Sequence, residues 1–253
     1  MQTRPTTAYD AAFYEGQRGG SSASSRIILT IAKELFAPRS LVDVGCGAAT
    51  WLRTARALGI SDVTGVDGSW SRNQHEDAEG IAFHYADLSA CCLDLGRRFD
   101  LAMSVEVAEH LPPDSSDRFV DLLAGLSDRI LFSAAVPHQG GVNHVAERWQ
   151  SDWARRFQRH GYRAYDAIRP RVWSNPDVAW WYRQNVILYV KPGAEVPALG
   201  QPRDPADLDV VHPDMLAKVL NEVPMRHAYR AVLNPRRYTR ALRSRLRGLW
   251  RGQ

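Results

Sequence analysis

Apolar runs alternate with amphipathic segments along most of the chain. Apolar residues at helical spacing predict helices over 26–36, from Thr50 onward, over 119–126 and over 148–160. Short apolar and β-branched runs predict strands from Ser40 and over 62–66, 81–85, 100–104, 129–136, 162–172 and 183–190. Because strands alternate with helices, we expect a Rossmann-like, doubly wound α/β fold, with a mostly parallel seven-stranded sheet and helices on both faces.

The same pattern divides the chain into three parts. Residues 1–24 are expected to form an N-terminal arm or lid, because 9–20 combine aromatic and polar side chains. Aromatic residues bury well anywhere, so this arm either covers a ligand or packs on the core. Residues 25–192 hold the predicted sheet. Residues 193–253 begin with a stretch rich in Pro, Gly and Asp, which is typical of a linker, and end in a basic tail.

Positive charge is concentrated at the C-terminal end. The formal net charge is +4, but 225–253 carry nine arginines and no acidic residue, so the rest of the chain is net negative. From Pro235 onward, apolar residues recur every three or four positions among these arginines, as in a basic amphipathic helix. Such a helix binds an anionic membrane surface, its own domain or a partner protein, and these alternatives stay open. We expect no nucleic-acid partner.

The remaining bulk properties are those of an ordinary globular protein. No run of about 18 apolar residues is present to span a bilayer, and the N-terminus lacks the apolar run of a secretory signal. We therefore expect a cytoplasmic protein, with peripheral contact at the inner membrane surface as an option for the tail. The three cysteines include no C-x-x-C pair, which argues against a disulfide framework and a zinc knuckle.

Acidic residues and glycines gather at the ends of the predicted strands. Asp43 ends the first strand just before Gly45 and Gly47, whose missing Cβ atoms allow a ligand to approach the backbone. Asp67 follows the second strand, where an acid suits a ribose diol, and Asp87 follows the third. Carboxylates at successive strand ends, beside a free helix N-terminus, suit a ligand with an amino-acid end, a ribose and an adenine.

A nucleotide-dependent oxidoreductase is the alternative for this turn. Thr50 stands where a dinucleotide enzyme has the third glycine of G-x-G-x-x-G. No tyrosine precedes a lysine by four positions, although many reductases use that pair for proton transfer. An NAD(P)-dependent reductase or epimerase is therefore the less favoured interpretation.

Four motifs resemble those of the class I S-adenosylmethionine (SAM)-dependent methyltransferases. They are Leu-Val-Asp-Val-Gly-Cys-Gly at 41–47, Val-Thr-Gly-Val-Asp at 63–67, His-Tyr-Ala-Asp-Leu at 84–88 and Phe-Asp-Leu-Ala-Met-Ser at 99–104. The resemblance spans about 25–192 and implies SAM as the cofactor, with the glycine turn at its methionine part, Asp67 at the ribose and the 87–88 pair at the adenine. The expected cofactor residues are Asp43, Gly45, Cys46, Gly47, Asp67, Asp87, Leu88 and Ser104. Ala49 replaces a glycine that is common in the family.

Three flanking segments resemble a bacterial subgroup of this family that is linked to polysaccharide or secondary-metabolite biosynthesis. They lie at 9–17, 139–149 and 180–185. The resemblance implies a small-molecule acceptor, a sugar or a secondary metabolite, and methyl transfer to oxygen is favoured over transfer to nitrogen. Ala146 stands where the subgroup has Asn, which removes one polar contact to the acceptor. Tryptophans in the second half of the domain suit flat sugar rings, although such residues also build cores.

A hydroxyl acceptor must lose its proton during transfer, and an imidazole is a suitable base near neutral pH. His144, in the loop after the fifth strand, is the first candidate, and Glu147 is placed to orient it or stabilise its charge. His110, after the fourth strand, is the second candidate. His138, His144 and Glu147 also have the composition of a metal site, but methyl transfer does not require a metal and we expect none. A catalytically silent SAM-binding scaffold remains as an alternative of a different class.

Overall fold

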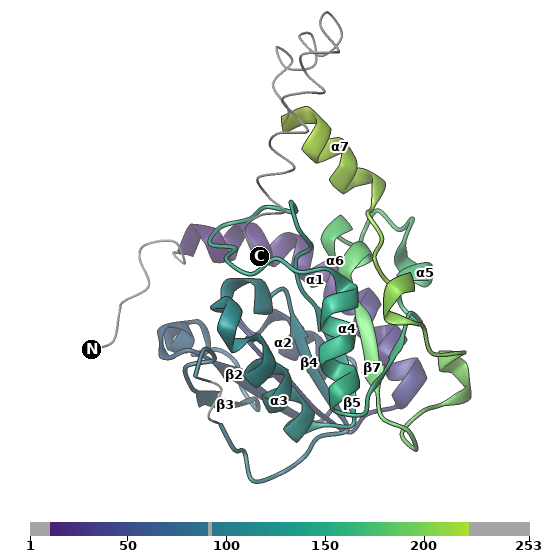
Figure 1. Cartoon of the computed structure of the whole chain (residues 1–253). Coiled ribbons are helices and arrows are strands. Elements are labelled where there is room, and N and C mark those ends of the chain that lie inside the picture. The colour runs from purple at the N-terminus through teal and green to yellow at the C-terminus, as the bar shows by residue number, and fades with distance from the viewer. Residues whose placement is uncertain (1–10, 91–92, 223–253) are drawn as a thin grey trace, which may run out of the picture. The chain divides into compact units, whose positions relative to one another are not determined.

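The computed structural model describes residues 11–90 and 93–222 (Figure 1). The chain divides into two compact units, residues 1–212 and residues 213–253, and the sheet lies in the first. Of the second unit, the structure describes helix α7 (Pro213–Glu222), in which Leu216 and Leu220 are exposed. No helix within the described ranges is both long and apolar enough to cross a membrane. The amphipathic tail predicted from Pro235 onward lies outside the described residues and stays a prediction.

A seven-stranded sheet with the order β3-β2-β1-β4-β5-β7-β6 forms the centre of the first unit. The strands are β1 (Ser40–Val44), β2 (Asp62–Asp67), β3 (Ala82–Tyr85), β4 (Leu101–Val105), β5 (Arg129–Ser133), β6 (Arg163–Tyr165) and β7 (Ile187–Val190). Strands β1 to β5 pair in parallel, and β7 runs antiparallel to β5 and β6. The predicted doubly wound, mostly parallel sheet is confirmed. The strand order reverses between β1 and β4, so a crevice opens at their carboxyl ends.

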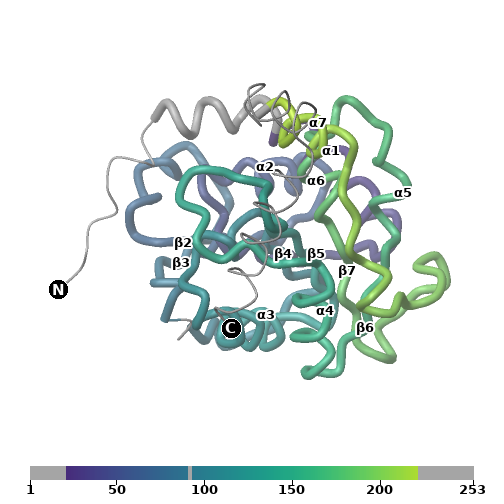
Figure 2. Tube along the Cα trace, turned by 45° about the horizontal axis from the view of Figure 1, so that its top comes forward, coloured from purple at the N-terminus to yellow at the C-terminus, as the bar shows by residue number. Residues whose placement is uncertain are grey.

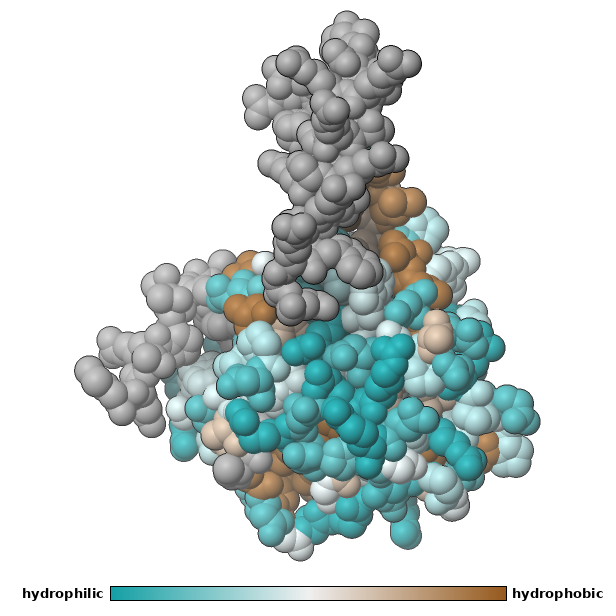
Figure 3. All heavy atoms as spheres, viewed as in Figure 1, coloured by the Kyte–Doolittle hydropathy of each residue, from teal (hydrophilic) through white to brown (hydrophobic). Residues whose placement is uncertain are grey.

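Helices cover both faces of the sheet, and Figure 2 shows the strands between the two helical layers. The helices of the first unit are α1 (Ala11–Phe36), α2 (Thr50–Ala57), α3 (Ser116–Leu126), α4 (Gln150–Arg159), α5 (Arg169–Val172) and α6 (Trp180–Asn185). Because side chains alternate along a strand, Leu41 and Met103 pack with α1 and α2, whereas Val42 and Ala102 pack with α3 and α4. The surface over α4 is largely hydrophilic (Figure 3).

The last strand begins later than the sequence predicts. Residues 183–185, which we expected to open that strand, form the end of α6, and β7 starts at Ile187. The helical turn brings two consecutive polar side chains into the interior. Gln184 Nε2 lies 3.5 Å from Gln139 Oε1, and Asn185 Nδ2 lies 2.9 Å from the same oxygen. In a strand, consecutive side chains point to opposite faces, so both contacts require the helix.

The prediction of one strand over 162–172 is also wrong in its second half. The strand ends at Tyr165, and α5 begins at Arg169. The guanidinium of Arg169 is buried and pairs with Asp166 at 2.8 Å, and it also donates to the backbone oxygen of Leu208 at 2.9 Å. A turn after β6 is needed to bring Arg169 and Asp166 together at a spacing of three residues.

Two expected domain boundaries differ from the structure. Helix α1 runs through residues 24 and 25 without a break, so the arm and the first predicted helix belong to one element. Residues 193–212, which we expected as a linker, belong to the first unit. Arg203 N–H donates to Ala164 O at 2.8 Å, and Asp209 accepts hydrogen bonds from Ser151. The prolines here open short 3₁₀ turns, η5 (Pro197–Leu199) and η6 (Pro205–Asp207).

Candidate active site

A small cavity lies where the carboxyl ends of β1 and β4 diverge. Its volume is about 80 Å³, and it is lined by Ser21, Asp43, Gly45, Cys46, Gly47, Ala48, Thr50, Trp51, Val105, Glu106 and Tyr182. Ser21 Oγ lies 3.1 Å from Tyr182 Oη, so α1 and α6 meet at this cavity. Small-molecule sites usually offer roughly 300 Å³ or more. The cavity therefore fits one end of a larger ligand.

The turn after β1 requires residues without side chains. Gly45 has a φ of 87°, and a Cβ atom on it would lie 2.4 Å from Cγ2 of Val107. Gly47 has a φ of 49°. Asp67 holds this turn from the neighbouring strand, because its carboxylate accepts hydrogen bonds from Gly47 N–H at 2.5 Å and from Gly68 N–H at 2.6 Å. The glycine turn and Asp67, which the sequence predicted separately, are thus joined by hydrogen bonds.

Two carboxyl groups beside the turn are buried. Burial, with a further contribution from the Asp67 carboxylate, raises the pKa of Asp43 to about 8. Burial also raises the pKa of Asp67, although the hydrogen bonds from Gly47 and Gly68 oppose this rise. Asp43 is therefore largely protonated at neutral pH in the free protein. A cationic group brought beside it would favour its ionised form.

His75 covers the glycine turn, and it is not among the site residues predicted from the sequence. It follows η2 (Ser69–Gln74), and its Nε2 lies 2.7 Å from Gly47 O. Its Nδ1 lies 3.0 Å from Tyr85 Oη, and its ring stacks on Phe83 with centroids 3.9 Å apart. A single histidine in a polar stretch gives no signal in the sequence. Phe83 and Tyr85 lie on β3, which pairs in parallel with β2.

Glu106 connects the small cavity with a buried polar network. It directly follows β4 and has a φ of 55°, a costly conformation for a residue with a side chain. Its carboxylate accepts hydrogen bonds from Gln139 Nε2 at 2.9 Å and from Asn185 Nδ2 at 3.1 Å. Burial raises the pKa of Glu106 against the effect of these donors. Positive φ angles of non-glycine residues recur around the site, at Ala49, Glu106, His138 and Asn143.

The structure brings together the three predicted catalytic residues. His144 Nδ1 lies 3.1 Å from Glu147 Oε1. The Glu147 carboxylate also accepts hydrogen bonds from the N–H groups of His138 and Gly140, both at 2.8 Å, so it fixes the loop that carries His144. The rings of His110 and His144 meet edge to face, with centroids 4.8 Å apart. Burial and the neighbouring His144 lower the pKa of His110 to about 4, so His110 is neutral at physiological pH.

Glu109 is a further member of this cluster that the sequence analysis did not single out. Its exposed fraction is 0%, and neither carboxylate oxygen has a hydrogen-bond partner of ordinary geometry among the described residues. Burial and the nearby Glu106 carboxylate raise the pKa of Glu109 well above its usual range. Glu109, His110 and His144 each offer one possible metal-ligand atom, and these three atoms lie within 4.8 Å of one another. The signal in the sequence was the spacing Glu-x-x-Glu-His after β4.

Four of the predicted cofactor residues do not line the small cavity. Asp67 borders it through Gly47. Asp87 is exposed, and hydrogen bonds from Ser89 Oγ at 2.6 Å and Ser89 N–H at 2.9 Å lower its pKa. Leu88 is buried in the core on the α3 and α4 side, and Ser104 lies on the strand face that points to that side. Their cofactor roles stay predictions.

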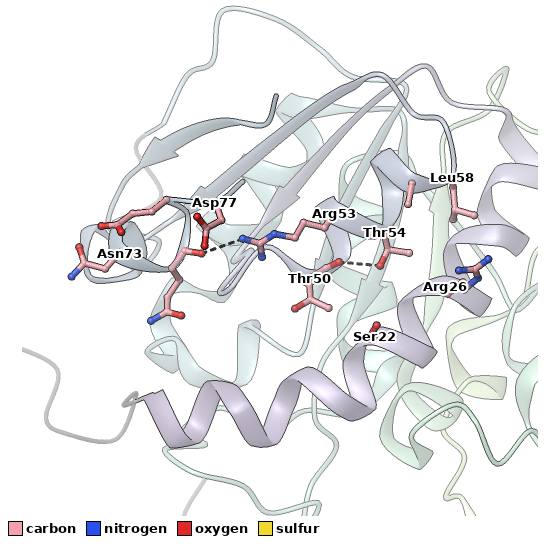
Figure 4. Close-up of a pocket in the computed structure, with 11 residues that line it drawn as sticks. Ser22, Arg26, Thr50, Arg53, Thr54, Leu58, Asn73 and Asp77 are labelled. Carbon is pink, nitrogen blue, oxygen red and sulfur yellow. Dashed lines mark hydrogen bonds between the residues drawn. The ribbon is translucent and has the colours of Figure 1, made fainter. Parts of the chain in front are cut away.

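A larger cavity of about 730 Å³ lies between α1, α2 and residues 73–77 (Figure 4). It is lined mainly by polar residues, namely Ser22, Arg26, Thr50, Arg53, Thr54, Ala57, Leu58, Asn73, Gln74, Glu76 and Asp77. Arg53 points from α2 toward residues 73–77 and donates to Gln74 O at 3.4 Å. No acidic residue at the ends of β1 to β3 lines this space, whereas Asp43 lines the smaller cavity. Thr50 lines both cavities.

Comparison with known proteins identifies a family. The model of the family described as "Methyltransferase domain" matches residues 17–185, which is more than half of the chain. A search of the curated proteins found no match. Neither this family match nor the solved structures described next support the nicotinamide-dependent alternative.

Solved methyltransferase structures share the fold. Human N-acetylserotonin methyltransferase in complex with SAM gives a TM-score of 0.53 at 18% identity, over 71% of this chain and 55% of that one. An O-methyltransferase family protein from Burkholderia thailandensis gives 0.55 at 15% identity, over 74% and 62%. The sugar N-methyltransferase KedS8 from Streptoalloteichus sp. gives 0.56 at 18% identity, over 76% and 98%. This chain thus spans less than two thirds of the first two proteins. At these identities the likeness shows the fold.

Proposed function

Because this chain belongs to the class I SAM-dependent methyltransferases, we propose that it transfers the methyl group of SAM to a hydroxyl group of a small polar acceptor, a sugar or a natural product. The observation that supports transfer to oxygen is the pair formed by His144 and Glu147, next to a neutral His110. A neutral hydroxyl group is a weak nucleophile, so a base that removes its proton is useful to an O-methyltransferase.

The small cavity is the proposed place of the methionine end of SAM. Asp43 lines this cavity as a buried carboxyl group that can pair with the ammonium group. The N-cap Ala49 makes no side-chain hydrogen bond to the start of α2, so free N–H groups remain there for the carboxylate. The ribose and the adenine would continue toward Asp67 and toward Asp87 with Leu88, at the ends of β2 and β3. Cofactor binding then requires the cavity to widen.

SAM supplies an electrophilic methyl group on a sulfonium sulfur. The residues of this chain would hold an acceptor oxygen about 3 Å from that carbon and exclude water, since positioning contributes much of the rate. The proton of the hydroxyl group would pass to Nε2 of His144 as the oxygen takes the methyl group from the sulfonium sulfur. Glu147 accepts the Nδ1 proton of His144 in a hydrogen bond and stabilises the imidazolium that results.

Polar and aromatic groups near the site support a hydroxylated acceptor. Hydroxyl, amide and charged side chains dominate the larger cavity, which shares Thr50 with the lining of the smaller one. Trp149 follows Glu147 closely in the chain and is 37% exposed, so it offers a flat face of the kind that packs on sugar rings. These features agree with the acceptor class that the sequence resemblance implies.

The experiment that tests this function follows labelled methyl groups. The full chain is incubated with methyl-labelled SAM and with fractions of a bacterial extract or a set of sugars, and the product is analysed for O-methyl and N-methyl groups. We expect one fraction to acquire an O-linked label. An N-linked product would contradict the choice of oxygen. If SAM binds but no fraction acquires a label, the silent scaffold becomes the better interpretation.

A further inference from the structure

We propose that Glu109, His110 and His144 bind a divalent cation of the Mn²⁺, Co²⁺ or Zn²⁺ class beside the methyl-transfer site. Binding of the ion follows from the geometry of these three residues. Its catalytic role, activation of the acceptor hydroxyl group, rests on the proposed function. From the sequence alone we expect no metal, and the metal-type set that the sequence offers is a different one, with His138 and Glu147 in the places of Glu109 and His110.

The buried carboxyl group of Glu109 is the first observation. A carboxyl group without hydrogen-bond partners is expensive to bury, and buried charges in proteins are usually paired with another charge or coordinated to a metal. Glu109 is fully buried, and both of its oxygens are without partners of ordinary geometry in the described part of the chain. Its surroundings nevertheless hold two imidazole rings, His110 and His144, which are common metal ligands.

The distances within the cluster suit a single ion. Metal–ligand distances of about 2.0–2.2 Å place two ligand atoms of one ion at most about 4.4 Å apart. The three candidate ligand atoms lie within 4.8 Å of one another in the ion-free structure. Small rotations of the His110 or His144 ring would bring them to bonding distance. Two imidazoles and one carboxylate leave further coordination positions open for an acceptor oxygen and water.

The orientation of His144 is that of a metal ligand. Its Nδ1 faces Glu147, at 3.1 Å, which leaves Nε2 as the free nitrogen. Ligating histidines usually donate their other N–H group to a carboxylate or carbonyl in this way. Gly141 makes room for the His144 ring itself, because a Cβ atom on Gly141 would lie 2.2 Å from Nε2.

The number of carboxyl groups around the cluster also favours a cation. Glu106, Glu109 and Glu147 contribute three carboxyl groups to this small region. Among the described residues, none of the three forms an ion pair with a lysine or an arginine, and Glu106 is held by the neutral amides of Gln139 and Asn185. A divalent cation would pair with the ionised forms of these carboxyl groups.

A bound ion would change how the acceptor is activated. Nε2 of His144 would then be a ligand rather than the base of the ion-free protein. A hydroxyl group coordinated to the ion would have a lowered pKa, and its proton would pass to water. The oxygen would then form its bond to the methyl carbon as the carbon–sulfur bond breaks. Thus the ion would replace the imidazole as the group that activates the hydroxyl group, and the methyl transfer itself would be unchanged.

Binding of Mn²⁺ to the metal-free full chain tests the site without any acceptor. Electron paramagnetic resonance would count the free Mn²⁺ during a titration, and Zn²⁺ would be added as a competitor. We expect one strong site per chain. Glu109→Gln and His144→Asn should each weaken Mn²⁺ binding more than tenfold, and Glu147→Gln, which removes the negative charge from the partner of Nδ1, should weaken it by about 10–100-fold.

His138→Asn is the matched control, because His138 lies in the same loop but outside the cluster and Asn tolerates its positive φ. It should bind Mn²⁺ within twofold of the unchanged chain. Binding of S-adenosylhomocysteine (SAH), measured on every sample, shows that each variant is folded. If the unchanged chain binds SAH but no Mn²⁺, or if Glu109→Gln and His144→Asn bind Mn²⁺ normally, the metal site is wrong and the methyltransferase proposal stands. If the unchanged chain binds Mn²⁺, the Glu109→Gln and His144→Asn variants bind it weakly, and no methyl transfer is found, only the proposed function is overturned.

Discussion

Nδ1 of His144 lies 3.1 Å from Oε1 of Glu147, and the same carboxylate accepts the backbone N–H groups of His138 and Gly140. One carboxylate thus fixes both the loop after β5 and the imidazole that this loop carries. The arrangement leaves Nε2 of His144 as the nitrogen that is available for chemistry. The position of His144, rather than its presence alone, is therefore the basis of the catalytic proposal.

Replacement of His144 by Asn should leave cofactor binding intact and slow methyl transfer. A positioned acid or base contributes about 10²–10⁴-fold to a rate, so we expect a loss of turnover in that range. Isothermal titration with SAH and single-turnover transfer from labelled SAM would measure the two effects separately, with His138→Asn as the control. A His144→Asn variant with full activity would remove this residue from the mechanism.

Gly141→Ala tests the position of the His144 ring without removing it. The added Cβ atom would lie 2.2 Å from Nε2, so the ring must move, and a displacement of about 1 Å can reduce a rate by roughly 10². We expect slower transfer with an SAH affinity within about twofold of the original. Gly125→Ala, in α3, is the control, because its Cβ atom meets nothing within 4 Å and should stabilise the helix by about 0.5–1 kcal/mol. Equal turnover in both variants would contradict the assigned position.

Asp67→Asn should weaken SAH binding by more than tenfold. The carboxylate fixes the glycine turn through Gly47 and Gly68, and we propose that it also holds the ribose diol. A hydrogen bond to a charged group contributes about 1.5–3 kcal/mol, which corresponds to roughly 10–100-fold in affinity. Titration calorimetry would measure the change, and circular dichroism would check the fold. An unchanged affinity would leave Asp67 without its ribose role.

The affinity for SAH should rise between about pH 6 and pH 8, because Asp43 must ionise to pair with the ammonium group. Its pKa is raised to about 8 in the free protein, so binding near pH 7 should release a proton. Calorimetry in buffers of different ionisation enthalpy measures that proton. This proton release should disappear in Asp43→Asn. It should persist in Asp87→Asn, because the carboxyl group of Asp87 has a lowered pKa. Proton release that survives in Asp43→Asn would show that another group is responsible.

The raised pKa of Asp43 also makes the stability of the cofactor-free protein depend on pH. Its protonated form is favoured by the fold, so its contribution to the free energy of unfolding is complete below the pKa of the unfolded chain, near 4, and declines as the pH rises through about 8. Cofactor binding offsets this decline. The cofactor-free protein should therefore gain more from SAH at pH 8 than at pH 6.

The positions of β1, β2 and β4 could be predicted because each is a short apolar run that leads into an acid or a glycine, namely Gly45, Asp67 and Glu106. Residues 41–44 and 62–66 were placed correctly for this reason. The prediction was wrong for 183–185, because the aromatic residues before them gave no signal for a turn of helix. The linker predicted from residue 193 was also wrong, since composition does not show that Asp209 bonds to Ser151.

The site was only partly visible in the sequence. His110, His144 and Glu147 were recognised as chemical groups, but nothing local shows that Glu109 is fully buried. That property depends on a loop more than thirty residues away, whose Val145 and Ala146 N–H groups bond to the Glu109 backbone oxygen. His75 was missed for the same reason, since its partners Gly47 and Tyr85 come from different strand ends.

A crystal structure of the chain with SAH tests the central proposal most directly. We predict that the amino-acid end of SAH occupies the cavity lined by Asp43, Gly45 and Gly47, with its ammonium group at Asp43. The sulfur should face Glu106 and the His110–His144 cluster, so that the missing methyl group points toward Nε2 of His144. SAH bound on another surface, or a sulfur that faces away from this cluster, would contradict the account.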